Sequence, residues 1–326
     1  MRIGRRGENG AALIAVLALV ATCSVLAAAM VLLGRVHRTE VHTRCAMSAS
    51  RYLAESAMNR IIWLLTADRE LFPDSVPGEV DYDDFSHDRY MADGVIHTME
   101  YMGRTVRFRI EDAVGGLDLS SGSSGLEVLL TGREDDTAVA DALERFGDRI
   151  DDYIDADDSV TGDGMEADDF EAAGQEPLPR NGTWQYREEL MWLPEAEKFL
   201  PCDRFGRPVG IMFPQASASD SRPNLFTATW TELTTRGGLT QSEALQVLEA
   251  LNRWRREKTP LSDTLDGTLY LNLTGNFRLD ESGVYRVTVE QAAADGQPSA
   301  VLSAVFEAYS GAPDGNVLTF WEWMVF

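Results

Sequence analysis

The sequence predicts an α+β protein in which a long N-terminal helix packs on a small antiparallel sheet, with a large inserted domain that is mainly helical. Three observations lead to this class. A helical pattern occupies residues 11–66, period-two alternation occurs near residues 106–110 and 287–289, and helical periodicity dominates the stretch between them. The chain has 326 residues, 44% hydrophobic and 25% charged, which is typical of folded proteins.

The N-terminal segment is the most informative part of the chain. Residues 11–33 form 23 consecutive positions without a charged side chain. At ~1.5 Å per residue a helix of this length spans about 34 Å, enough to cross a hydrocarbon core of ~30 Å. The apolar run exceeds the ~7 to 15 residues of a signal peptide, and no small-residue cleavage pattern ends it. We therefore expect a single-pass transmembrane helix; a cleaved signal peptide is the alternative.

Charged residues beside this helix indicate its orientation. Arg2, Arg5 and Arg6 precede the apolar run, while Arg35 and Arg38 follow it. A short basic leader before a first span favours a cytoplasmic N-terminus. The bulk of the chain would then lie on the opposite side of the membrane.

The helical pattern continues beyond the apolar run. Leu53, Ala57, Ile61 and Leu64 recur at steps of three and four, and no proline occurs before Pro73. We expect one helix of roughly 55 residues that ends near residue 66, apolar all round in its first half and striped in its second. Such a helix would leave the membrane and pack one face on a folded domain.

Two β regions are expected on either side of the insertion, at residues 67–112 and 263–326. Val106, Phe108 and Ile110 alternate with arginines, and Val287 and Val289 alternate with polar residues. Further strands are expected at 300–309 and 317–326. The aromatic side chains of the last strand favour a core position beneath the long helix, with a partner-binding strand as the alternative.

The intervening residues 113–262 predict a helical domain. Residues 136–154 carry apolar side chains at helical steps, and Thr240 with Glu243 forms a capping box that opens another helix. Residues 67–326 contain 21 basic and 50 acidic side chains, a net charge of −29. Because this charge repels phosphate backbones, we expect no nucleic-acid partner.

Arg5, Arg6 and Gly7 lead to Gly10, and the apolar segment starts at Ala11. This arrangement resembles the class III leader of type IV pilin-like proteins. The resemblance implies that residues 1–10 form a prepilin leader, that the prepilin peptidase cuts between Gly10 and Ala11, and that the new amine of Ala11 is methylated. It also implies a type IV pilin-like fold.

The fifth mature residue is glutamate in most such proteins, whereas here it is Ala15. The K subunit, the large minor pseudopilin of the type II secretion system, normally lacks that glutamate. Segments of the inserted domain also resemble the K family in the same order: Glu111-Asp112, Leu117-Asp118-Leu119, Tyr153-Ile154-Asp155-Ala156-Asp157-Asp158, Pro179-Arg180-Asn181-Gly182 and Arg187-Glu188-Glu189-Leu190. Ser120, Phe226 and Tyr153 depart from the family pattern, so the chain is identified as a divergent member of the general secretion pathway protein K family.

This resemblance implies a function and a location. The protein would cap the tip of the periplasmic pseudopilus and assist protein export across the outer membrane. Its partners would be the I-type and J-type minor pseudopilins, the major pseudopilin, the prepilin peptidase and the inner-membrane secretion platform. The chain would be a single-pass inner-membrane protein with a cytoplasmic N-terminus and a periplasmic bulk.

An acidic stretch provides candidate metal ligands. Residues 141–176 contain 14 carboxylates against two arginines, and such crowding opposes compaction unless water or a cation screens it. Asp157 and Asp168 occupy the first and last positions of an EF-like loop, which Met165 at its ninth position weakens. The K family binds calcium in its inserted domain, so the resemblance implies a calcium site with ligands from Asp155, Asp157, Asp158, Glu166 and Asp168. A solvated acidic loop is the alternative.

Catalytic motifs are missing from the sequence. It has four histidines, His37, His42, His87 and His97, and no GxSxG, HExxH or P-loop pattern. We therefore expect a protein that is not an enzyme. A hydrolase built on two carboxylates needs no local motif, so a membrane-anchored periplasmic hydrolase or binding protein is the alternative function.

Overall fold

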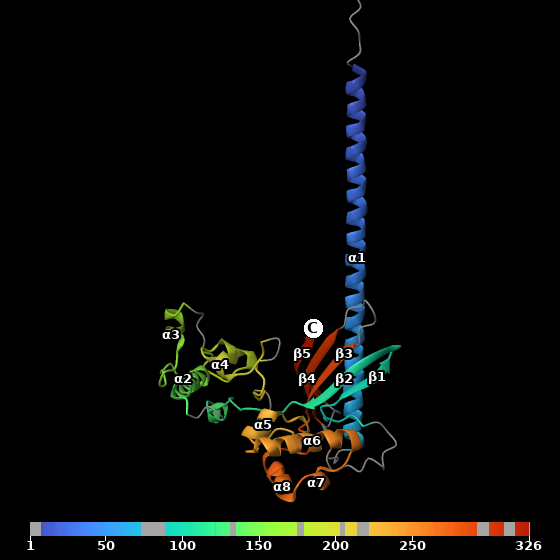
Figure 1. Ribbon diagram of the computed structural model, residues 1–326. Helices are drawn as coiled ribbons and strands as arrows, with labels where there is room; N and C mark the ends of the chain where they lie inside the picture. Colours follow the sequence, from blue (N-terminus) through green and yellow to red (C-terminus); the bar gives the residue numbers. More distant parts are fainter. Residues whose placement is uncertain are drawn as a thin grey trace, which may run out of the picture.

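The computed structural model describes residues 8–72, 89–120, 122–130, 135–174, 179–202, 206–213, 222–291, 300–309 and 317–325. Its order is one long helix, two strands, a helical segment and three more strands. Figure 1 shows the helix standing far beyond the sheet, with the other elements at the level of its C-terminal part and α2 and α3 well to one side. The predicted fold class is confirmed. The leader residues 1–7 lie outside the described residues.

Helix α1 (Glu8–Leu71) has 64 residues, about 96 Å at ~1.5 Å per residue. It is continuous with no cis peptide or proline within it, and it ends five residues later than the sequence predicts. The N-terminal part projects from the fold, and burial begins at Ser50. Because a turn of helix needs only local hydrogen bonds, the projecting part keeps its backbone paired without tertiary support.

The sheet has five antiparallel strands in the order β1-β2-β3-β4-β5. They are β1 (Ile96–Tyr101), β2 (Arg104–Asp112), β3 (Val284–Gln291), β4 (Val301–Tyr309) and β5 (Val317–Val325). Strand β2 pairs with β3 across the whole insertion, with Ile110 opposite Val287. The predicted alternation at 106–110 and 287–289 is therefore confirmed, because Val106, Val287 and Val289 face the same core.

The C-terminal part of α1 packs against β3 and β4. Ala54, Ala57, Ile61 and Leu65 are fully buried in this interface, at the three- and four-residue steps that the sequence shows. They meet a layer of apolar side chains from the sheet, among them Val106, Ile110, Val287, Val289, Leu302 and Phe306. Trp63 lies on the opposite side of the helix and is 58% exposed. One face of the helix is therefore core and the other faces outward.

Buried ion pairs join the end of α1 to both halves of the chain. Asp68 receives two hydrogen bonds from the guanidinium of Arg89, at 2.7 and 3.0 Å. The next residue, Arg69, places Nη1 3.1 Å from Oε2 of Glu281, which also accepts a hydrogen bond from the hydroxyl of Tyr285. Burial raises the pKa of Glu281. Removing one partner of such a pair would leave the other charge buried and unpaired, which is strongly destabilising. These contacts therefore hold the end of the helix in place.

The segment between β2 and β3 holds the remaining helices. They are η2 (Leu126–Leu130), α2 (Thr137–Ile154), α3 (Ala167–Ala172), η3 (Arg187–Trp192), α4 (Ala196–Phe199), η4 (Leu225–Thr227), α5 (Trp230–Thr235), α6 (Gln241–Glu257), α7 (Leu261–Thr264) and α8 (Gly267–Asn276). The predicted helix at 136–154 and the capping box at Thr240 are both present, the latter with Glu243 Oε2 2.8 Å from the Thr240 amide. Helices continue past residue 262, to Asn276.

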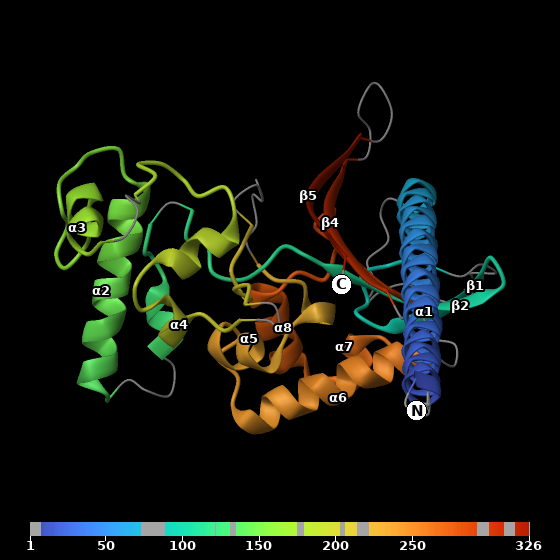
Figure 2. The same ribbon diagram turned by 90° about the horizontal axis from the view of Figure 1, so that it is seen from above.

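Two separate cores divide this helical segment. One gathers around Phe146, Phe170 and Trp184 and includes α2, α3, η3 and α4. The other gathers around Phe226 and Trp254, whose rings lie 4.3 Å apart, and includes α5 to α8. Figure 2, which looks along α1, shows α2 and α3 on the side of β5 that is remote from α1, with α6 nearer to α1.

The prediction that α1 covers the aromatic last strand is wrong. Phe320 and Trp323 on β5 are 45% and 40% exposed. Strand β5 lies beyond β4 and therefore beyond the strands on which α1 packs. The register also shifts between Val305 and Phe306, so Trp321 is an extra residue of β5 and strict alternation of faces fails there.

Candidate functional site

The projecting part of α1 is the first functional feature. Within the described residues it is the one helix long and apolar enough to cross a membrane. Its apolar side chains are exposed, from Leu13 at 63% to Leu33 at 69%. An apolar surface of this extent is stable in lipid rather than in water. The predicted membrane helix at residues 11–33 thus has the length and composition of a single-pass anchor.

The few polar side chains of this part are satisfied within the helix itself. The hydroxyl of Thr22 donates to the carbonyl oxygen of Ala18 at 2.9 Å, and that of Ser24 donates to the carbonyl oxygen of Val20 at 2.8 Å. Internal pairing is what a hydrocarbon environment requires, since it offers no water to these groups. Ala15 lies in this exposed apolar surface and contributes no carboxylate.

The predicted cleavage site lies at the start of the same helix. Gly10 and Ala11 both belong to α1, which begins at Glu8. In the intact chain the peptide bond between them is therefore helical. The residues that precede Glu8 lie outside the part of the chain that the structure describes, so the geometry of the leader is not on view.

A group of carboxylates at the meeting point of α2 and α3 is the second feature. Asp152 lies in the last turn of α2, Asp155 is its C-terminal cap, and Glu166 is the N-terminal cap of α3. Asp152 is fully buried and Glu166 is 5% exposed. We call these three residues the carboxylate cluster. A helix end and a helix start position its members from either side of the loop that joins them.

Four carboxylate oxygens of the cluster lack a donor among the described residues. Within the described residues no hydrogen bond reaches Oδ2 of Asp152, Oδ1 of Asp155 or either carboxylate oxygen of Glu166, although all four atoms are buried. Oδ1 of Asp152 accepts from the backbone N–H of Thr161 at 2.9 Å. The loop backbone also packs closely on Asp152, because a Cβ at Gly164 would collide with this carboxylate. Buried acceptors of this kind normally find a donor or a cation.

The electrostatics of the cluster agree with that geometry. Burial, followed by the charges of Asp152, Asp155, Asp158 and Asp157, raises the pKa of Glu166 to about 7. Burial also raises the pKa of Asp152. Like charges in a site that excludes water disfavour ionisation of each other. A hard cation such as calcium prefers carboxylate oxygens, so the residue types of the cluster suit it.

The five predicted ligands are not equally close to this cluster. Asp155 and Glu166 belong to it. Asp157 and Asp158 act on Glu166 by their charge but are exposed, and Asp157 accepts a hydrogen bond from the Ser159 amide at 2.8 Å. Asp168 is exposed in the first turn of α3. Among the described residues no group of three or more His, Cys, Asp or Glu side chains is gathered tightly enough to hold a metal as they stand.

Sequence reasoning missed Asp152. The signal was available, because Asp152 and Asp155 are three residues apart and lie on one side of a helix. Asp151, in contrast, faces another way and accepts hydrogen bonds from the amide and hydroxyl of Ser123, both at 2.7 Å. The two adjacent aspartates therefore point in different directions from the helix. Asp151 has a structural role, and Asp152 is a candidate ligand.

Comparison with solved structures gives a structural likeness. No family model and no curated protein match the chain. The chain is similar to one chain in the crystal structure of the GspK-GspI-GspJ complex from the type 2 secretion system of enterotoxigenic Escherichia coli. The two chains share 13% sequence identity at a TM-score of 0.43, over 85% of this chain and 99% of the other.

Proposed function

We propose that the protein is a minor pseudopilin of a type II secretion system. The observation that carries the proposal is the form of α1, whose projecting apolar part continues without a break into a part that packs on an antiparallel sheet. A subunit built in this way can be held in a membrane and can also stack on neighbouring subunits through the same helix. The leader-like sequence before Ala11 and the helical insertion support the K type of pseudopilin.

The leader provides the test. Cleavage by the prepilin peptidase would produce a mature chain that begins at Ala11 with a methylated amine, measurable by mass spectrometry of the purified protein. Gly10→Val should prevent cleavage and leave the mass of the intact chain, whereas Ile3→Val, an equally small change within the leader, should be cut normally. A mature N-terminus at Met1 or beyond Leu33 would refute the proposal. It would favour the alternative, a membrane-anchored periplasmic hydrolase or binding protein.

A position at the tip of the pseudopilus is supported by Ala15. In the proposed stacking, a carboxylate at this position attaches an incoming subunit to the subunit above it, and alanine offers none. Nothing then needs to lie above this subunit. The helical insertion would also be too bulky to repeat along a thin fibre. Gold labelling of isolated filaments should mark one end, and uniform labelling along their length would contradict the tip position.

The proposed partners follow from the same position. A subunit at the tip would contact the I-type and J-type minor pseudopilins directly, and it would reach the major pseudopilin, the prepilin peptidase and the inner-membrane secretion platform during assembly. The N-terminus would be cytoplasmic and the folded part periplasmic, where it would assist export across the outer membrane as a structural component. Protease added to spheroplasts should therefore digest the folded part, whereas protection would reverse the orientation.

Calcium binding at the carboxylate cluster is a further part of this proposal. Asp152, Asp155 and Glu166 would supply buried carboxylate oxygens, and Asp157 and Asp158 would add charge at the rim. A bound calcium ion would be the positively charged partner that these carboxylate oxygens do not find among the described side chains. The role of the ion would be structural, because it would hold the end of α2 to the start of α3.

A further inference from the structure

Strand β5 lies at one edge of the sheet, paired with β4 on one side. It is nine residues long and contains one ionisable side chain, Glu322, and neither lysine nor proline. Sheet edges are normally protected by charges, prolines or short strands, because an unpaired row of N–H and C=O groups accepts another strand. By these criteria, and among the strands that the structure describes, β5 is an unprotected edge.

The single charge of β5 is neutralised from within the molecule. Oε1 of Glu322 lies 2.8 Å from Nη2 of Arg187, and Oε2 lies 3.4 Å from Nη1 of Arg207. Arg187 is 5% exposed and its guanidinium stacks 3.9 Å above the ring of Phe213. The carboxylate therefore connects β5 to the insertion and does not repel a strand that approaches the edge.

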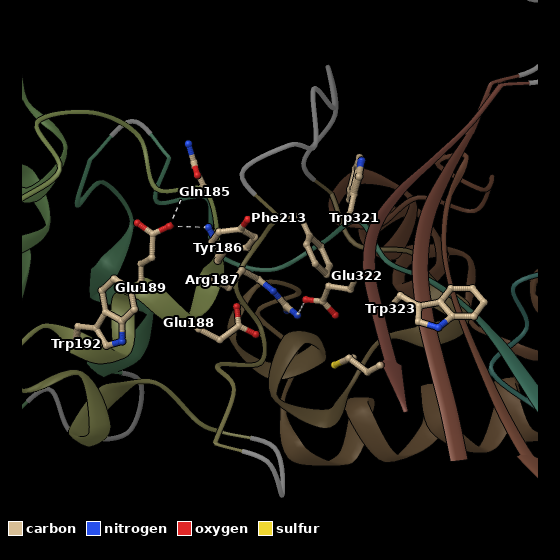
Figure 3. A pocket seen from close by; sticks show the side chains of 11 residues that line it. Gln185, Tyr186, Arg187, Glu188, Glu189, Trp192, Phe213, Trp321, Glu322 and Trp323 are labelled. Atoms are coloured by element: carbon tan, nitrogen blue, oxygen red, sulfur yellow. Dashed lines mark hydrogen bonds and ion pairs between the residues drawn. The ribbon is translucent and has the colours of Figure 1, made fainter. Parts of the chain in front are cut away.

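A groove runs between η3 and β5, where this ion pair joins the two. Figure 3 shows Arg187 and Glu322 meeting across it, with Trp192 and Glu188 on the η3 side. Its volume is about 390 Å³, within the range of ligand-binding clefts. The residues lining it include Tyr186, Arg187, Glu188, Trp192, Phe213 and the β5 residues from Trp321 to Met324.

The walls of the groove are exposed aromatic side chains. Tyr186 and Trp192 on the insertion are 60% and 56% exposed, whereas the ring of Trp323 packs against that of Phe320 on the other face of β5. Phe213 lines the groove on the side of β5, where its ring contacts that of Trp321 at 5.6 Å. Exposed tryptophan and tyrosine around a rigid floor are typical of the centres of protein interfaces.

Charge decides which polypeptide suits the groove. The chain carries a net charge of −24, so a second copy would be repelled, and Glu188 adds a carboxylate to the groove lining. An extended backbone can pair with the whole row of backbone groups along the edge of β5. We propose that the edge of β5 and η3 form a docking groove for an extended segment of a different polypeptide, which alternates apolar with basic or neutral side chains and adds as a sixth strand.

The proposal does not depend on the pseudopilin role and can be tested on the full chain in detergent. The probe is a fluorescein-labelled octapeptide in which valine alternates with threonine and lysine, followed by anisotropy. Two matched probes carry N-methyl groups on alternate backbone nitrogens or glutamate in place of lysine. Trp192→Ala removes a groove wall, and Trp63→Ala on α1 is the control, since the two side chains are 56% and 58% exposed.

We expect the lysine peptide to bind the unchanged protein with a Kd below about 1 mM. Trp192→Ala should raise this Kd by about fivefold or more, the scale of an interface anchor, and Trp63→Ala should leave it unchanged. Glu188→Lys should weaken binding of the lysine peptide and strengthen that of the glutamate peptide. The proposal is overturned if the lysine peptide does not bind, if both N-methylated and plain peptides bind equally, or if Trp192→Ala has no effect.

Discussion

Glu166→Gln should change the stability of the protein with opposite signs in the absence and in the presence of calcium. Without calcium, the glutamine removes a carboxylate that is buried beside Asp152 and Asp155 and has no hydrogen-bond donor among the described residues. With calcium, the same change removes a proposed ligand. A residue that served only packing would change stability in the same direction under both conditions.

The magnitude follows from the pKa of Glu166, which rises from 4.5 to about 7. Because the folded-state pKa is the higher one, the stabilising contribution is complete below about pH 4.5 and is lost as the pH rises through 7. One pKa unit corresponds to about 1.4 kcal/mol, and nearby water screens part of the effect, so ionised Glu166 costs roughly 2 kcal/mol at pH 8. Calcium at one hundred times its Kd would return about 2.7 kcal/mol for one site.

The assay is thermal unfolding of the full chain in detergent at pH 8, with either chelator or calcium. In chelator, Glu166→Gln should raise the Tm by about 4 to 8 °C, since 1 kcal/mol corresponds to about 2–4 °C for a domain of this size. Calcium should raise the Tm of the unchanged protein but not that of the variant. In chelator the unchanged protein should also be more stable at pH 6 than at pH 8.

Glu171→Gln is the matched control, because Glu171 is an exposed glutamate of the same short helix, α3. It should alter neither the Tm in chelator nor the response to calcium. The reasoning is refuted if Glu166→Gln lowers the Tm in chelator. Calcium binding is refuted if chelator and calcium give the same Tm for the unchanged protein.

Three further predictions concern the fold. Ile61→Ala should lower the free energy of unfolding in urea by about 2–5 kcal/mol, because Ile61 is fully buried between α1 and the sheet. Trp63→Ala should lower it by less than about 1 kcal/mol. Equal losses of stability would contradict the assigned helix face. The carboxylate of Asp112 accepts hydrogen bonds from both the amide and the hydroxyl of Ser282, and burial raises the pKa of Asp112 to about 6. Ser282→Ala should therefore lower the free energy of unfolding by about 1.5–3 kcal/mol at pH 7 and by less at pH 5. A loss of stability that does not depend on pH would argue against an ionised Asp112 at pH 7. Thr240→Ala should cost about 0.5–2 kcal/mol through the lost cap of α6, and Thr240→Ser should restore most of it; an unchanged urea midpoint would show that the capping box does not stabilise the helix.

Local patterns in the sequence predict the elements of this protein well. The buried positions Ala57, Ile61 and Leu65 of α1 follow the helical period, and the capping box at Thr240 starts α6 at Gln241. The strands near 106–110 and 287–289 follow from alternation alone. These features depend on side chains within a turn of helix or along one strand, so the information lies in adjacent residues.

The carboxylate cluster was predicted only in part. An excess of acidic residues between 141 and 176 pointed to this region, and Asp155 and Glu166 were named from it. Asp152 was missed and Asp168 is exposed, because composition does not reveal which side of α2 is buried or where the loop to α3 turns. Helical phase assigns Asp151 to Ser123 and Asp152 to the cluster, a distinction that depends on packing.

The sequence by itself determined the long apolar helix, the strand positions and the acidic character of the insertion. Only the tertiary structure decided that β5 is an exposed edge, that Arg187 neutralises Glu322 from 135 positions away, and that Arg69 meets Glu281 at the end of α1. Periodic burial is a property of neighbours along the chain. A contact between distant segments depends on how every intervening element packs, and no local pattern of side chains contains that information.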